Sequence, residues 1–153
     1  MIGVFLKTFY LFFNKLWDPI TCDTFADNKS KKVSTGIFFS RFFTTGTSGV
    51  DAFAYDWSKY KNWIVPPVHL IYMTISLMRM CKARGTLVIP KWKSAVFWPM
   101  IINSFTDNHQ SYIKDLREYK NPHQTIPTRI ARKSIFAKQP FHSSALVLLI
   151  NFH

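Results

Sequence analysis

Acidic side chains are scarce in this sequence, and their scarcity excludes several kinds of metal-dependent enzyme. Only eight of the 153 residues are Asp or Glu, and they are scattered singly along the chain. A two-metal site needs a cluster of carboxylates, and the sequence offers no candidate set for one. The five histidines show neither a His-Glu-x-x-His pattern nor a cysteine at short range. We therefore expect no metal site.

Cysteines and long apolar runs are also lacking. The two cysteines, Cys22 and Cys81, lie far apart, which supports neither a disulfide framework nor a zinc site. This usage fits a reduced intracellular setting, cytoplasmic or nuclear. No run reaches the ~18 uninterrupted apolar residues of a membrane-spanning helix. The apolar opening of the chain is interrupted by Lys7, Asn14 and Lys15 and no cleavage site follows it, so we expect neither an export signal nor a membrane partner.

The rest of the composition is that of a folded, basic domain. Hydrophobic residues make up 48% of the chain and aromatic residues 17%, which is too apolar for a disordered protein. The length suits one core, so we expect a single domain over residues 1–153. Twenty Lys and Arg residues give a net charge of +12, which favours contact with polyanions such as nucleic acid without naming a chemistry.

Residues 62–102 show the clearest pattern of secondary structure. Residues 62–65 read as a strand that Pro66-Pro67 halts, because proline cannot donate to a sheet ladder. A long apolar helix over 68–84 follows, then a buried strand over 86–89 and a second helix over 94–102. Strand, helix, strand and helix in this order predict an α/β fold, with a small, mostly parallel sheet flanked by helices.

The flanking segments give weaker signals. We expect a helix over 3–16 packed by most of its surface, short strands over 20–26 and 50–54, a helix over 111–120 and a final strand over 145–152. Residues 121–140 contain three prolines and several basic residues without apolar periodicity, which predicts a poorly ordered basic loop.

A family resemblance rests on five segments that occur in order: CDTFAD, FFSRFFTTGTSGVDAFAYDW, NWIVPPVHLI, CKARGTLVIPKWKSAVFWPMI and ALVLLINFH. Together they resemble the segment downstream of the reverse transcriptase and RNase H regions in DIRS-type retroelement polyproteins, over residues 17–152. That segment is in turn similar to the Dam-type adenine methyltransferases of phages. Their pattern runs from an Asp-x-Ala-Ala strand through an Asn-Pro-Pro-Tyr turn to an apolar strand ending in Pro. The resemblance implies a degenerate Rossmann-like methyltransferase, carried on a fragment of a polyprotein with the reverse transcriptase and RNase H region as partner.

The residues that match the family's catalytic turn are Val65, Pro66, Pro67 and Val68. In an adenine methyltransferase, the Asn or Asp before the prolines accepts a hydrogen bond from the target amine. A proline carbonyl accepts a second one, and the aromatic residue after the prolines stacks on a flipped base. Valine has neither an acceptor nor a π-face, so the resemblance implies an inactive catalytic centre. Asn62 cannot simply replace Val65, because it lies three residues earlier on a strand whose side chains alternate between faces.

The resemblance also implies few contacts to a cofactor. Asp23 matches the family's strand-end Asp, and Asp51 is a weaker candidate for the same role. The Gly-rich loop that lets the backbone approach such a cofactor is missing. A strand-end Asp also serves as a turn or helix cap, so both readings of Asp23 stay open. We expect no bound cofactor, and S-adenosylmethionine only if the chain is an active enzyme.

Cations lie beside aromatic rings at the predicted strand ends, and this combination suggests a nucleic-acid surface. Phosphates attract the cations, and unstacked bases stack on the aromatic rings. The candidates are Lys59, Lys61, Trp63, Lys91, Trp92 and Lys93. A solvated basic surface without function is the alternative. Three hypotheses result. The chain is an inactive methyltransferase-like module that assists reverse transcription or nucleic-acid handling, an active S-adenosylmethionine-dependent DNA adenine methyltransferase, or a nonspecific nucleic-acid-binding accessory without a cofactor.

Overall fold

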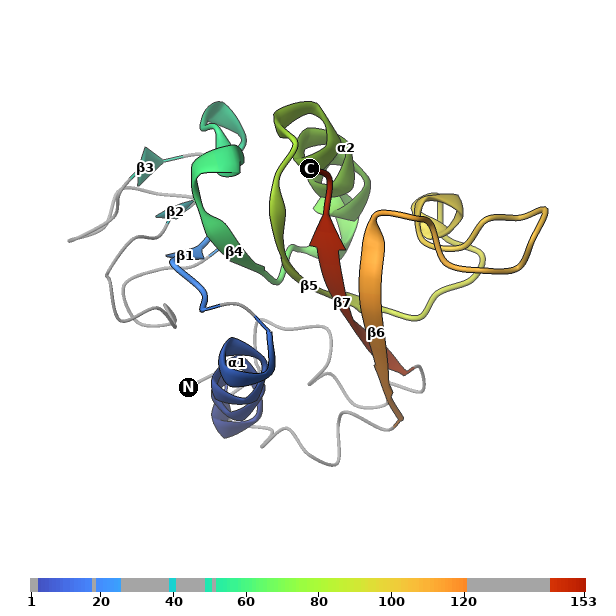
Figure 1. Cartoon of the computed structure of the whole chain (residues 1–153), viewed down its shortest axis with the longest axis horizontal. Coiled ribbons are helices and arrows are strands. Elements are labelled where there is room, and N and C mark those ends of the chain that lie inside the picture. The colour runs from blue at the N-terminus through green and yellow to red at the C-terminus, as the bar shows by residue number, and fades with distance from the viewer. Residues whose placement is uncertain (1–2, 18, 26–38, 41–48, 51, 121–143) are drawn as a thin grey trace.

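A five-stranded sheet forms the centre of the protein (Figure 1). A computed structural model describes residues 3–17, 19–25, 39–40, 49–50, 52–120 and 144–153. The strand order is β1-β4-β5-β7-β6, with β1 at Cys22–Asp23, β4 at Lys61–Ile64, β5 at Arg84–Pro90, β6 at Ile113–Tyr119 and β7 at Ala145–Asn151. A separate parallel pair joins β2 (Phe39–Ser40) to β3 (Gly49–Val50).

The fold is α/β, as predicted, but the sheet is mixed. β1 pairs with β4 and β4 with β5 in parallel, whereas β7 is antiparallel to both β5 and β6. Two of the four pairings are thus antiparallel, and the expectation of a mostly parallel sheet is not confirmed. The sequence did not reveal this because residues 145–150 form a continuous apolar run, and such a run indicates burial on both faces but not strand direction.

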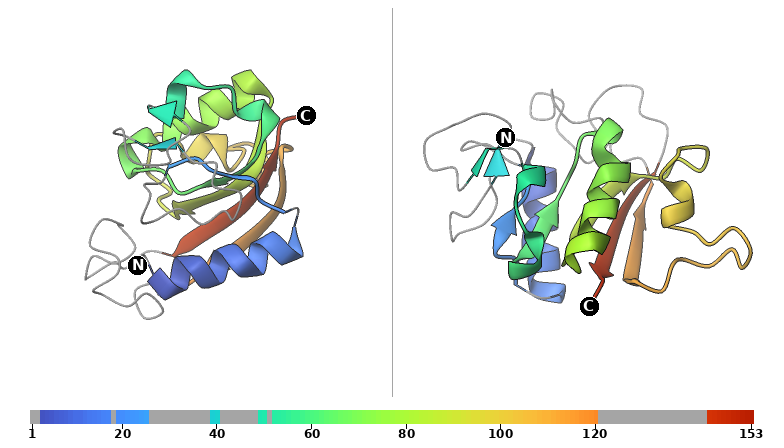
Figure 2. Two further views of the ribbon diagram at one scale, coloured as in Figure 1. Left: turned by 90° about the vertical axis from the view of Figure 1, so that its left-hand side faces the viewer. Right: turned by 90° about the horizontal axis from the view of Figure 1, so that it is seen from above.

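Helices cover both faces of the sheet, and each builds its own core (Figure 2). On one face, α2 (Ile71–Cys81) buries Ile71, Ile75 and Met78. On the other, α1 (Gly3–Leu16) buries Tyr10 and Phe13. Neighbouring strand residues alternate between these two cores, which is the period-2 pattern of a sheet buried on both sides.

Helix α1 has the predicted extent, but over residues 10–16, whose side chains the structure describes, it is not packed by most of its surface. Leu11, Phe12 and Leu16 are 57%, 51% and 45% exposed. The predicted helix 68–84 is a 3-10 turn over Val68–Leu70 followed by α2. It ends early because Lys82 adopts a left-handed conformation with φ of 52°, after which the chain enters β5.

Two further predicted helices are also corrected. The segment 94–102 contains only a 3-10 turn, Trp98–Met100, whose Pro99 lacks the N–H that a longer helix needs. Residues 111–120 form strand β6, because pairing along β7 overrides their local preference. Of the predicted strands 20–26 and 50–54, the structure has the short β1 and β3, and Ala52–Ala54 is a 3-10 turn. The loop predicted over 121–140 lies outside the described residues.

Candidate functional site

The Pro66-Pro67 turn lies beyond the carboxyl end of β4, where the strand–turn–helix pattern predicts it. Ile64 ends the strand, and the 3-10 turn before α2 begins at Val68. The backbone N–H of Leu70 donates to the Pro67 carbonyl at 2.9 Å, which closes this turn. In open α/β sheets, the carboxyl ends of parallel strands are the usual place for a ligand. The turn is therefore in position for chemistry.

The side chains at this turn serve packing. Val65 is half-buried and packs against the core beneath α1, whereas Val68 packs against the core beneath α2. Pro66 is buried and Pro67 is exposed. Neither valine carries a hydrogen-bonding group, and the Pro67 carbonyl already accepts from Leu70. These four residues form a bend at the end of β4 whose side chains offer no hydrogen-bonding group to a target amine.

Asn62 is fully buried and binds the backbone of neighbouring segments. Its Nδ2 donates to the carbonyls of Trp57, Tyr60 and Arg84 at 3.0, 3.2 and 2.9 Å. Its Oδ1 accepts from Thr24 Oγ1 at 3.1 Å. The amide thus links β4 to β5 and to the end of β1. It is therefore not available as the hydrogen-bond acceptor that the side chain at position 65 lacks. An Asn within an otherwise apolar strand is the sequence signal for such a buried polar link.

Asp23 and Cys22, at the end of β1, are closed to solvent. Asp23 is 4% exposed and Cys22 is 0% exposed. Burial raises the pKa of the Cys22 thiol to about 12, and the Asp23 charge acts in the same direction. Burial, and secondly the charge of Asp23, also raises the pKa of Tyr10. Asp23 thus lies against the core beneath α1 and is not open to a cofactor, while Asp51 lies outside the described residues.

The buried thiol predicts a loss of stability in alkali. An unfolded cysteine ionises near pH 9.0, whereas folded Cys22 does so near 12. The folded state therefore holds more protons between these values, and the free energy of unfolding should fall by up to about 1.4 kcal/mol per pH unit from this group. Urea unfolding of the wild type and of Cys22→Ala from pH 8 to 10.5 measures the slope.

The variant should show the shallower slope, and the remaining tyrosine contributions should be common to both proteins. Ser94→Ala, at an exposed position without a titrating side chain, is the control and should keep the wild-type slope. Equal slopes in Cys22→Ala and wild type would contradict the assignment.

The predicted nucleic-acid residues do not share one surface. Lys59 and Lys61 lie at the amino end of β4, with Lys59 in the 3-10 turn Trp57–Lys59. Lys91, Trp92 and Lys93 follow the carboxyl end of β5. Because β4 and β5 are parallel, the two groups lie at opposite ends of these strands.

The groups also differ in exposure. Trp63 is 1% exposed and meets Tyr10 edge to face at 5.7 Å, so its prediction as a base-stacking residue is wrong. Trp92 is half-buried between the two cores. Lys91 pairs with Glu118 at 3.0 Å, while Lys59 and Lys93 are exposed.

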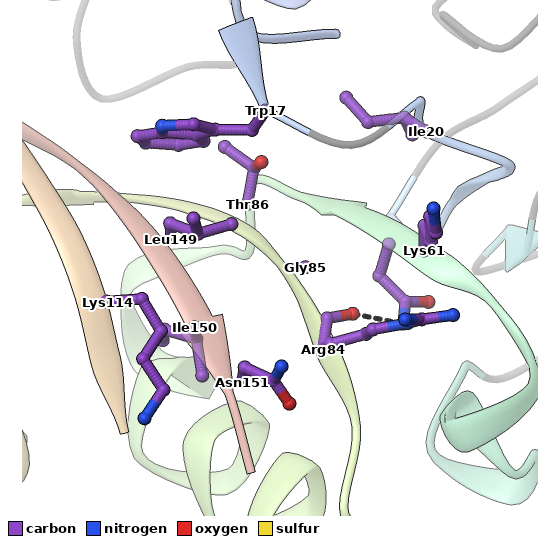
Figure 3. A pocket seen from close by; sticks show the side chains of 11 residues that line it. Trp17, Ile20, Lys61, Arg84, Gly85, Thr86, Lys114, Leu149, Ile150 and Asn151 are labelled. Carbon is purple, nitrogen blue, oxygen red and sulfur yellow. Dashed lines mark hydrogen bonds between the residues drawn. The ribbon is translucent and has the colours of Figure 1, made fainter. Parts of the chain in front are cut away.

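A hollow of about 90 Å³ lies at the amino ends of β4 and β5, whereas the Pro-Pro turn follows the carboxyl end of β4 (Figure 3). It is lined by Trp17, Ile20, Lys61, Asn62, Arg84, Gly85, Thr86, Lys114, Leu149, Ile150 and Asn151. Of these, Lys61 is a residue that the sequence analysis proposed as a nucleic-acid contact, and Arg84 is a further cation at a predicted strand end. The others come from segments far apart in the chain, and only the strand pairing brings them together.

Comparisons with known proteins give no match: no family model, curated protein or solved structure is similar to this chain. Within the part of the chain that the structure describes, no three His, Cys, Asp or Glu side chains gather as metal ligands. None of the described helices has the length and apolar character needed to span a membrane. Family and function therefore stay proposals that rest on the residues themselves.

Proposed function

We propose that this chain is a catalytically inactive, adenine-methyltransferase-like module of a retroelement polyprotein, which handles nucleic acid beside the reverse transcriptase and RNase H region. The quoted sequence segments are its first support. The second is the unit β4, Pro66-Pro67, α2 and β5, whose strands pair in parallel and carry the turn at the carboxyl end. A Rossmann-like reading of the sheet is part of the proposal. β7 is antiparallel to both neighbours, so β6 has the direction of β5, and only β7 is reversed among the five strands.

The observation that carries the inactivity is that the side chains of the turn offer no hydrogen-bonding group to an amine and that the nearest amide is already bonded. Val65 packs into the core, and the Pro67 carbonyl accepts from the N–H of Leu70. The amide of Asn62 donates to three backbone carbonyls and accepts from one hydroxyl. Asp23, the matching cofactor contact, is 4% exposed. An active enzyme would need each of these changed, because methyl transfer requires the amine to be held in line with the donor.

Titration with S-adenosylmethionine, followed by thermal unfolding, tests the proposal. We expect no shift in melting temperature, whereas a cofactor at 100 times its dissociation constant would add about 2.7 kcal/mol of stability. The Val65→Asn, Val68→Tyr double variant should still transfer no methyl group to adenine-containing DNA, because the cofactor contact is closed as well. A clear shift in the wild type, or methylated DNA from either protein, would instead support an active methyltransferase.

The nucleic-acid part of the proposal is supported by charge. The chain carries +12, and exposed Lys59 and Lys93 are available to phosphates. Binding of this kind is dominated by phosphate contacts and weakens steeply with salt. The same observations suit an accessory that binds nucleic acid without any methyltransferase ancestry, and in that case too S-adenosylmethionine has no effect.

A further inference from the structure

The hollow beside Gly85 is positively charged. Lys61, Arg84 and Lys114 line it, and no acidic residue does so among those that the structure describes. One carboxylate adjoins the hollow: Asp115 Oδ2 accepts from Nε1 of Trp17, which lines the hollow, and from Arg117 Nη2, each at 3.2 Å. The three lining cations outnumber this one negative charge. Cations around a concave surface with low-dielectric walls concentrate anions there.

Arg84 carries a donor that has no acceptor. Its Nε is buried and makes no hydrogen bond to any described residue. A buried donor left in this state costs about 1–3 kcal/mol. An anion in the hollow would bring oxygen acceptors to the same side chain. The planar guanidinium binds phosphate or carboxylate oxygens in pairs, which a lysine cannot do.

The shape of the hollow suits a small group with an attached planar or apolar part. Gly85 is one of its lining residues and brings no side chain to it. In Figure 3, Trp17, Thr86 and Leu149 gather on one side of Gly85. The volume of about 90 Å³ is several times what one water needs and too small for a whole dinucleotide. A phosphate fits the hollow, and a base or sugar fits beside the half-buried indole of Trp17.

We propose that this hollow is a phosphate-binding site, with Arg84 and Lys61 as the anion contacts and Trp17 as the wall beside the attached nucleoside. Two sources share this chemistry: a backbone phosphate of single-stranded nucleic acid and a free phosphate. The first rests on the proposed nucleic-acid function and the second does not. The site lies at the amino ends of β4 and β5, and the Pro-Pro turn lies at the carboxyl end of β4.

Two measurements on the full chain test the site. Binding of a fluorescein-labelled oligothymidylate is followed by anisotropy over a salt series, and inorganic phosphate is added in thermal unfolding against sodium chloride of equal ionic strength. Arg84→Gln should weaken oligonucleotide binding about tenfold and reduce the salt slope by about 0.7. Inorganic phosphate should raise the melting temperature of the wild type and not that of the variant. Lys120→Gln removes the same charge at an exposed position just after the carboxyl end of β6 and is the matched control.

The outcomes separate the two proposals. Equal weakening by Arg84→Gln and Lys120→Gln, with the same phosphate response as wild type, would overturn the site and leave a diffuse basic surface. A wild type that binds no oligonucleotide, yet is stabilised by phosphate through Arg84, would keep the site and refute nucleic-acid handling. Should Arg84→Gln not unfold cooperatively, Lys61→Gln is judged by the same two criteria.

Discussion

Replacing Asn62 with leucine is expected to lower the free energy of unfolding by at least about 3 kcal/mol. The leucine would remove the amide that donates to the carbonyls of Trp57, Tyr60 and Arg84 in the core. Of these, the Trp57 carbonyl keeps a second donor, the N–H of Tyr60 at 3.3 Å. Each buried group without a partner costs about 1–3 kcal/mol, and these costs overlap because the three carbonyls share one amide. Urea unfolding monitored by tryptophan fluorescence measures the loss.

The control for this variant is Asn108→Leu, in the exposed loop that follows the 3-10 turn Trp98–Met100. It should stay within about 0.5 kcal/mol of the wild type, as most surface substitutions do. A loss below about 1 kcal/mol for Asn62→Leu would mean that water or a backbone shift replaces the amide, and that Asn62 does not hold β4 to β5.

Gly85→Ala is expected to have an effect of similar size through a different cause. The new Cβ would lie 2.5 Å from the Asn62 carbonyl oxygen, 2.9 Å from the Asn62 Cβ and 3.1 Å from its carbonyl carbon. Two of these three atoms belong to the backbone of the paired strand, so no side-chain rotation relieves the contact. The strands must separate, and we expect a loss of about 3 kcal/mol, or roughly 6–12 °C in melting temperature.

Thermal unfolding followed by circular dichroism measures this effect, with Ser94→Ala at an exposed position as the control. A melting temperature for Gly85→Ala within about 2 °C of the wild type would show that β4 and β5 can move apart cheaply. The hollow beside these strands could then also change its shape and volume.

Local chemistry allowed the sequence to predict the centre of the fold. Pro66-Pro67 ends β4 because proline cannot continue a ladder, and the apolar run after Gly85 forms β5. Both features act over a few neighbouring residues. The final strand was predicted for the same reason, from its run of apolar side chains between Ala145 and Ile150.

Features that depend on distant partners were not predictable in this way. Residues 113–119 favour no single structure by themselves, and become β6 because β7 supplies a ladder from about thirty residues further along the chain. Trp63 was expected to stack on bases, and only the position of α1, with Tyr10 at its ring edge, makes it a core residue. The hollow was missed since Trp17, Arg84 and Leu149 meet only in the folded chain.

The place of β7 has a consequence for the order in which the chain is made. β7 lies between β5 and β6, yet the ribosome releases both of these neighbours before it. Until the residues from Ala145 onward emerge, one edge of β5 has no partner among the strands that the structure describes. An unpaired apolar edge is a template for wrong partners. During synthesis this edge of β5 is therefore exposed to non-native pairing until β7 has been made.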